Sequence, residues 1–131
     1  MDPDRLGKTL DAAIAAWTSG DAAAFAALFA EDGAMIVPGR RWVGPAAIQQ
    51  AAADFFKDYD AAIAVRQILV QGNRAAVEWR WQETCRQTGA SEAADDVIMV
   101  DFKAGQIARW REYIDRATPE ADPGTAVGEP E

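Results

Sequence analysis

The sequence contains no histidine and only one cysteine among its 131 residues. The lack of histidine excludes serine–histidine and cysteine–histidine catalysis, as well as the usual histidine-containing zinc sites. Cys85 cannot form a disulfide within the chain, and no histidine is present to activate it as a nucleophile. No spacing typical of metal ligands occurs, so we expect no metal and no other cofactor.

Positive charge is also scarce, with 13 basic residues against 21 acidic ones and a net charge of −8. An acidic surface repels phosphate groups, so we expect neither nucleic acids nor membranes as partners. The N-terminus lacks the basic and apolar regions of a signal peptide, and no apolar run approaches the roughly 18 residues of a membrane span. Together with the single cysteine, this predicts a cytoplasmic protein.

Half of the residues are hydrophobic, which is enough for one core in a chain of this length. We expect one domain over residues 1–116. Residues 117–131 contain three prolines, four acidic residues and no large apolar side chain besides Val127, which predicts a disordered acidic tail.

Three segments carry apolar residues at helical spacing. Asp2-Pro3 begins the first helix, which ends at Gly20, while Asp21 caps the second and Pro45 opens the third. Between the second and third helices we predict a turn over residues 31–33, a strand over 34–37 and a glycine-bounded loop over 39–44.

From residue 62 onward the apolar period changes to two, which is typical of strands. Strands are predicted over residues 62–71, 75–85, 96–102 and 107–115, joined by tight turns and by a polar loop over 86–94. Helices grouped before an antiparallel meander predict an α+β domain with the sheet curled around the helices. The open mouth of such a cone is a natural pocket for a small molecule.

Three segments follow this order of elements: "SGDAAAFAALFAEDGAMIVP" (19–38), "RRWVGPAAIQQAAADFF" (40–56) and "GQIARWREYID" (105–115). Together they resemble the nuclear transport factor 2-like superfamily, in its SnoaL-like and ketosteroid-isomerase-like branch. The resemblance covers about residues 6–115. It implies a cone-shaped α+β fold, with three N-terminal helices packed in a curved, mainly antiparallel sheet (a cystatin-like α+β roll).

The catalytic residues of ketosteroid isomerases are mostly absent here. The place of their catalytic aspartate, before the proline that ends the first strand, holds Val37, and the place of their oxyanion tyrosine holds Ala13. Their protonated aspartic acid falls near Val97, or on Asp96 after a shift of one residue. Members that resemble limonene epoxide hydrolase use a final Trp-Arg-Asp-Tyr motif, which appears here with Glu112 in place of the aspartate.

Alternation along the strands, combined with the resemblance, predicts an aromatic pocket. Trp79, Trp81 and Glu83 share one face of their strand, and the resemblance implies that this is the concave face. The same parity turns Trp110 and Glu112 inward on the last strand. The predicted pocket residues are Trp17, Val37, Trp79, Trp81, Glu83, Met99 and Trp110. The alternative is that these tryptophans only fill the core.

Glu112 is the candidate catalytic residue. A carboxyl group on the inward face loses solvation, which raises its pKa toward the range of a general acid or base. The alternative is a structural ion pair with Arg40, Arg41 or Lys57. The sequence therefore leaves two functions open: acid–base catalysis of the isomerase, cyclase or hydrolase type on a small hydrophobic metabolite, or a non-catalytic ligand-binding or interaction domain.

The strand over residues 96–102 predicts a homodimer. It is apolar on both faces, and a strand of this kind is usually covered on both sides. We expect Met99 to face the helices and Ile98 and Val100 to face outward against a second copy of the chain. The alternative is that arginine side chains shield the outer face within the monomer.

Overall fold

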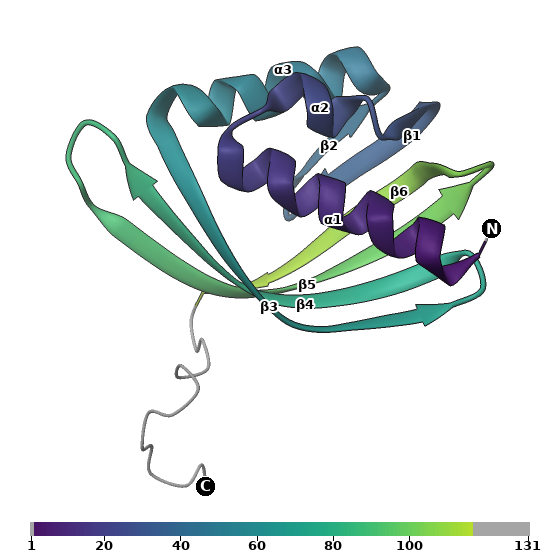
Figure 1. Ribbon diagram of the computed structural model, residues 1–131. Helices are drawn as coiled ribbons and strands as arrows, with labels where there is room; N and C mark the ends of the chain where they lie inside the picture. The colour runs from purple at the N-terminus through teal and green to yellow at the C-terminus, as the bar shows by residue number, and fades with distance from the viewer. Residues whose placement is uncertain (1, 117–131) are drawn as a thin grey trace, which may run out of the picture.

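Three helices cover one face of a curved six-stranded sheet (Figure 1). The computed structural model describes residues 2–116, and the predicted tail over 117–131 lies outside the described residues. The elements in chain order are α1 (Pro3–Ser19), α2 (Ala22–Ala26), β1 (Phe29–Val37), β2 (Arg40–Val43), α3 (Pro45–Asp58), β3 (Tyr59–Gln71), β4 (Arg74–Cys85), β5 (Ser91–Lys103) and β6 (Gln106–Asp115).

Local sequence signals set the ends of the helices. The Asp2 carboxylate accepts a hydrogen bond from the Arg5 backbone N–H at 2.8 Å, and Pro3 occupies the first turn of α1. Gly20, with φ at 74°, ends α1 in the left-handed conformation that glycine adopts without strain. Asp21 caps α2 in the same manner as Asp2 caps α1.

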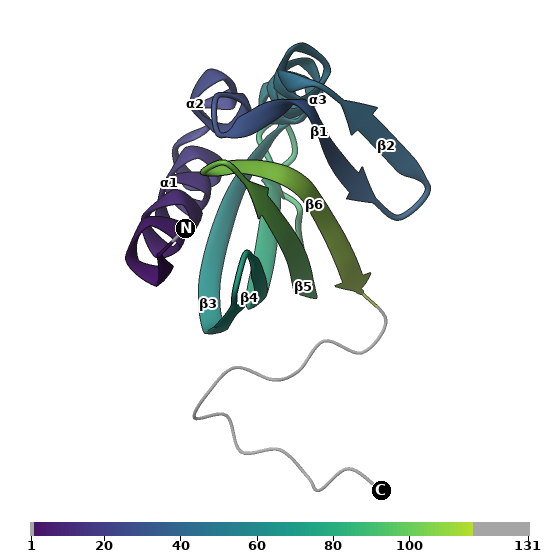
Figure 2. The ribbon, with the colours of Figure 1, turned by 90° about the vertical axis from the view of Figure 1, so that its right-hand side faces the viewer.

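The strand order of the sheet is β2-β1-β6-β5-β4-β3. All neighbours pair antiparallel except β1 and β6, which are parallel. The sheet curves from β3 beneath α1 round to β1 and β2 beside α3 (Figure 2). This arrangement confirms the predicted α+β cone with a mainly antiparallel sheet.

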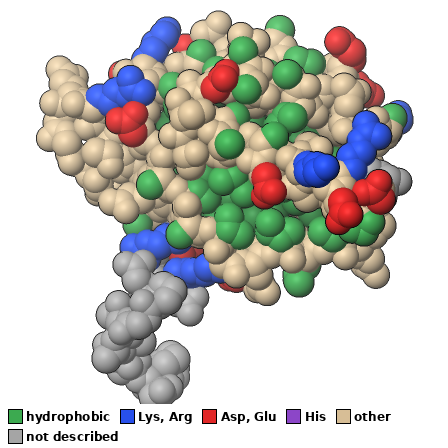
Figure 3. Space-filling model, in the orientation of Figure 1, with side chains coloured by type: hydrophobic (Ala, Val, Ile, Leu, Met, Phe, Trp, Pro, Cys, Tyr) green, Lys and Arg blue, Asp and Glu red, His purple; other side chains and the backbone are tan. Residues whose placement is uncertain are grey.

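The hydrophobic core lies between the helices and the concave face. Its fully buried side chains come from the inner stripes of the helices and from every second residue of the strands, and they include Leu6, Leu10, Phe25, Ile48, Val77, Ile98 and Ile107. Each contributes about 1.5–3 kcal/mol by leaving water. The edge strand β3 is only partly covered: Val65 and Val70 lie opposite Trp79 and Ala75 yet remain 43% and 39% exposed. Apolar side chains are accordingly visible on the surface below α1 (Figure 3).

The strand predicted over residues 34–37 lies within β1, but the turn predicted over 31–33 and the loop predicted over 39–44 were wrong. Residues 31–33 lie inside β1 rather than in a turn, and residues 40–43 form the edge strand β2, in which Trp42 pairs with Met35 and Arg41 with Ile36. An edge strand is held by backbone hydrogen bonds on one side only and needs no apolar alternation, which is why its sequence resembles a loop. The 86–94 loop is also shorter than predicted, because β5 begins at Ser91.

The predicted parity of β5 was also wrong. Antiparallel pairing sets Val77 opposite Ile98 and Ala75 opposite Val100, and directly opposed residues share a face. Ile98 and Val100 are therefore buried in the core, whereas Val97 is 37% exposed on the outer face. Met99 has the same parity as Val97. It lies in a shallow surface depression beside Leu69 and Val70, so it is not a pocket residue.

Candidate functional site

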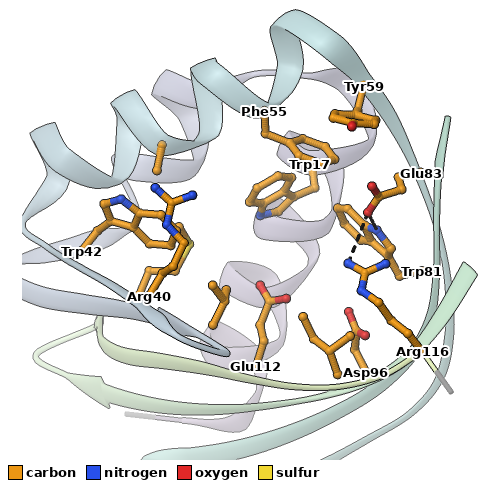
Figure 4. A pocket seen from close by; sticks show the side chains of 14 residues that line it. Trp17, Arg40, Trp42, Phe55, Tyr59, Trp81, Glu83, Asp96, Glu112 and Arg116 are labelled. Atoms are coloured by element: carbon orange, nitrogen blue, oxygen red, sulfur yellow. Dashed lines mark hydrogen bonds and ion pairs between the residues drawn. The ribbon is translucent and has the colours of Figure 1, made fainter. Parts of the chain in front are cut away.

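A cavity of about 340 Å³ opens between α3, the β1–β2 hairpin and the ends of β4, β5 and β6. Every layer of the fold contributes to its lining, which comprises Trp17, Met35, Val37, Arg40, Trp42, Ala51, Phe55, Tyr59, Trp81, Glu83, Asp96, Glu112, Ile114 and Arg116. Figure 4 shows the aromatic rings at the top and the carboxyl groups of Glu112 and Asp96 pointing up from the sheet toward them.

One wall of the cavity is a cluster of aromatic rings. Trp17, Phe55 and Trp81 contact one another with centroid distances of 5.6–5.7 Å, and Tyr59 stacks on Phe55 at 5.2 Å. The contacts of Trp17 with Phe55 and Trp81 are edge-to-face, and packing of this kind holds the rings in fixed orientations. On the opposite side of the cavity, the Arg40 guanidinium lies 5.0 Å from the centroid of the Trp42 ring.

Three indole N–H groups each donate a hydrogen bond to a carboxyl oxygen at the cavity. Trp79 bonds to Asp96 at 3.0 Å. Trp81 bonds to Glu83 and Trp110 to Glu112, both at 2.9 Å. Strand geometry brings these pairs together, because residues two apart on one strand share a face, as do residues directly opposed on neighbouring strands. The tryptophans therefore fix the orientation of all three carboxyl groups.

The carboxyl groups of Glu112 and Asp96 have raised pKa values. Burial raises the pKa of Glu112 to about 7, and the negative charge of Asp96 adds to this effect, although the hydrogen bond from Trp110 and the charge of Arg116 oppose it. Burial raises the pKa of Asp96 to about 6, against the opposing hydrogen bond from Trp79. Two interacting carboxyl groups of this kind take up and release protons near neutral pH as a pair.

The cavity wall also contains polar atoms with no hydrogen-bond partner among the described residues. They are the indole nitrogen of Trp17 and the Oδ1 atom of Asp96. Both side chains are more than nine-tenths buried. A buried polar atom without a partner costs roughly 1–3 kcal/mol of stability, so these two atoms are candidates for contact with a ligand.

The predicted site residues fall into three groups. Trp17, Val37, Trp81, Glu83 and Glu112 line the cavity. Trp79 and Trp110 lie beneath it, where they hold Asp96 and Glu112. Met99 lies on the outer face.

Sequence reasoning did not include Asp96 among the site residues. The sequence did indicate Asp96 in one way. If the alignment with the ketosteroid isomerases is shifted by one residue, their protonated aspartic acid falls on Asp96 instead of Val97. The pairing of Asp96 with Trp79 across the two strands gives the reason for the shift, since Trp79 faces inward.

Arg116 is the second residue that was missed. It follows β6, and its guanidinium lies 3.5 Å from Glu83 and 3.7 Å from Glu92.

Within residues 2–116, no group of three His, Cys, Asp or Glu side chains is arranged to hold a metal ion. No helix in the same range has the length and apolar character needed to cross a membrane.

Comparison with known families agrees with this geometry. A family model described as the SnoaL-like domain matches residues 10–110. The chain belongs to this family. No sequence among the curated proteins matches it at a significant level.

Several solved structures have the same fold. A candidate polyketide cyclase from Pseudomonas putida is 26% identical with a TM-score of 0.68, over 80% of this chain and 87% of that one. A candidate polyketide cyclase from Xanthomonas campestris is 25% identical with a TM-score of 0.71, and the match covers 84% of this chain and 90% of that one. A protein from Catenulispora acidiphila with a ketosteroid isomerase-like fold, solved with trimethylamine, is 18% identical with a TM-score of 0.74, over 80% and 83%.

Proposed function

We propose that this SnoaL-like protein is an acid–base catalyst that acts on a small, mainly apolar molecule. Glu112 is the proton-transfer group, and Asp96 is its partner. The observation that carries the proposal is the pair of inward-pointing carboxyl groups with pKa values of about 7 and about 6, set below a wall of aromatic rings. A catalytic carboxyl group that is to work at neutral pH needs a pKa in this range.

The chemistry that fits this pair is the transfer of a proton within the substrate. Near pH 7 the Glu112 carboxyl group is about half ionised, so it can accept a proton from one position of the substrate and return it to another. The hydrogen bond from Trp110 holds one oxygen of Glu112 in place during both transfers. Similar solved structures named as candidate polyketide cyclases support a reaction on a small organic molecule.

The alternative is a pocket that binds a ligand without chemistry. Two residues favour it, because Val37 and Ala13 stand where ketosteroid isomerases carry their catalytic aspartate and oxyanion tyrosine. Val37 lines the cavity, and Ala13 is fully buried in the core. An acid–base mechanism in this protein therefore has to use Glu112 and Asp96, because the places of the isomerases' base and oxyanion tyrosine carry apolar side chains.

Exchange of carbon-bound protons tests the proposal. The protein is incubated in deuterium oxide with a panel of small cyclic ketones, and deuterium uptake next to the carbonyl group is followed by mass spectrometry. We expect uptake with the wild-type protein and a loss of at least about 100-fold with Glu112→Gln, the usual range for removing a general acid or base.

The matched control is Glu92→Gln, which removes a carboxylate that is mostly exposed and does not line the cavity. It should leave the exchange rate unchanged. If wild type and Glu112→Gln exchange ketone protons at the same rate, or if neither does so above background, the non-catalytic alternative replaces the proposal.

We also propose that the protein is a homodimer, formed through the outer face of the sheet. The corrected parity of β5 changes the residues involved. Val97 lies between Glu78 of β4 and Tyr113 of β6, and Tyr113 is 49% exposed beneath the Arg111 guanidinium. A patch with exposed apolar groups and charges of both signs suits contact with its own copy across a two-fold axis.

Sedimentation equilibrium at micromolar concentration tests the dimer. We expect twice the chain mass of 14.1 kDa for wild type and a monomer for Val97→Glu. Val65→Glu is the control, because Val65 is 43% exposed on the concave side of the edge strand β3, opposite Trp79, and this variant should stay dimeric. A wild-type mass near that of one chain would contradict the dimer.

A further inference from the structure

Trp17 differs from the other buried tryptophans of the described chain. Trp79, Trp81 and Trp110 each donate their indole N–H to a carboxyl group, whereas the Trp17 N–H has no partner within residues 2–116. Trp17 also lines the cavity, and the nitrogen-bearing edge of its ring points toward the side of the cavity that carries Glu112 (Figure 4). An indole N–H can only donate, so its missing partner is a hydrogen-bond acceptor.

The ring of Trp17 is held firmly in this orientation. It contacts Phe25 at 5.1 Å, Phe56 at 5.0 Å, Phe55 at 5.6 Å and Trp81 at 5.7 Å between ring centroids. A donor fixed by packing needs little rearrangement when an acceptor arrives, which is the property that makes a donor effective in stabilising developing charge.

The charged side chains around the cavity restrict the charge that a ligand carrying this acceptor can have. Glu83, Asp96 and Glu112 line the cavity and would repel an anionic ligand. Arg40 and Arg116 also line it and, together with the donor of Trp17, disfavour an alkylammonium ion. A neutral oxygen acceptor on an apolar frame satisfies both conditions, since the remaining lining is largely aromatic and aliphatic.

We infer that the cavity binds a neutral carbonyl compound whose oxygen accepts a hydrogen bond from the Trp17 indole N–H. The reaction described next rests on the proposed acid–base function. Binding of the carbonyl compound to Trp17 does not require that function. In the reaction, Glu112 takes the proton from the carbon next to the carbonyl group. The electron pair of that C–H bond forms the carbon–carbon double bond of the enolate. The π electrons of the carbonyl group move to its oxygen, where Trp17 stabilises the negative charge, and Glu112 then returns the proton to carbon.

Binding of two matched probes tests the role of Trp17. Indanone and indane share one bicyclic frame, but only indanone carries the carbonyl oxygen. We expect the wild-type protein to bind indanone at least about ten-fold more tightly than indane, and Trp17→Phe to remove most of this difference, as expected for one lost hydrogen bond. The infrared band of the bound carbonyl group should shift to lower frequency in wild type and less so in Trp17→Phe. Thr18→Ala, an exposed neighbour of Trp17 on α1 that does not line the cavity, is the control and should keep the wild-type shift.

A measurement on the wild-type protein covers the case in which Trp17→Phe does not fold. On addition of indanone, the indole N–H proton resonance of Trp17 should move downfield, while those of Trp79 and Trp110, already bonded to carboxyl groups, should move much less. Equal affinity for the two probes, no binding of indanone, an unchanged Trp17 resonance or tight binding of tetramethylammonium would each overturn the inference.

The two proposals can fail separately. A Trp17-dependent carbonyl shift without proton exchange in any ketone would keep the carbonyl ligand and end the catalytic function. Proton exchange that depends on Glu112 but not on Trp17 would keep the catalytic function and end the role of Trp17.

Discussion

Glu112→Gln is expected to stabilise the folded protein above pH 7 by about 1–3 kcal/mol, even though it removes the proposed catalytic group. The physical reason is the burial that raises the Glu112 pKa from an ordinary value of 4.5 to about 7. A carboxyl group with a raised pKa holds its proton more tightly in the folded state. Its contribution to stability is therefore fully present below the unfolded pKa and is lost as the pH rises through the folded pKa. For Glu112 this window runs from about 4.5 to about 7.

Glutamine avoids this loss because it stays neutral at every pH. Its side-chain oxygen can still accept the hydrogen bond that Trp110 donates to Glu112. Denaturant unfolding at pH 5 and pH 8 is the measurement. We expect similar unfolding free energies for wild type and Glu112→Gln at pH 5 and a more stable variant at pH 8.

Asp96 contributes to the same pH dependence over a lower window, from 3.8 to about 6, so the variant should still lose some stability as the pH rises. Glu92→Gln is the control, and its unfolding free energy should follow that of wild type at both pH values. A Glu112→Gln protein whose stability stays parallel to wild type from pH 5 to pH 8 would show that Glu112 is not buried as described.

Gly33→Ala is expected to destabilise the fold by about 3 kcal/mol. A Cβ atom at position 33 would lie 2.7 Å from the carbonyl oxygen of Ile107 and 2.9 Å from that of Ala30. Both contacts are with backbone, which cannot move aside as a flexible side chain can. Gly33 lies where the register between β1 and β6 shifts, so the added methyl group would push these two strands apart.

Gly7→Ala is the matched comparison. Gly7 lies within α1, and a Cβ atom there would meet nothing within 4 Å. We expect this substitution to stabilise the protein by about 0.5–1 kcal/mol, because alanine has the higher helix propensity. Thermal unfolding of the two variants should therefore shift the midpoint in opposite directions, and a Gly33→Ala protein as stable as wild type would contradict the close approach of β1 and β6.

The fold could be predicted because its local signals agree with one another. Asp2, Gly20, Asp21 and Pro45 mark helix boundaries by capping chemistry that depends on a few neighbouring residues, and the structure has all of them at helix ends. The inward face of β4 was likewise recognisable, since large aromatic side chains alternate with polar ones there. The parallel pairing of β1 with β6 has no comparable local signal, because it joins residues that are far apart in the sequence.

The candidate site was predicted only in part because β5 carries no clear alternation. Val97 to Val100 are all apolar, so the hydrophobic pattern cannot say which of them face the core. The decisive polar residue, Asp96, faces inward against the usual preference of charged groups for water. Only the pairing with Trp79 accounts for its position, and that pairing is a property of the assembled sheet rather than of either strand.

The strand order has a consequence for how the protein reaches its native state during synthesis. β6 is the last strand of the described residues 2–116 to leave the ribosome, yet it lies in the interior of the sheet, between β1 and β5. Until it is available, the β1–β2 hairpin and the β3–β4–β5 meander are separate pieces with no backbone pairing between them. Contacts between distant parts of a chain form slowly, so we expect the joining of the two pieces to be the late step of folding. Glu112 lies on β6, and the same late step therefore completes both the sheet and the cavity.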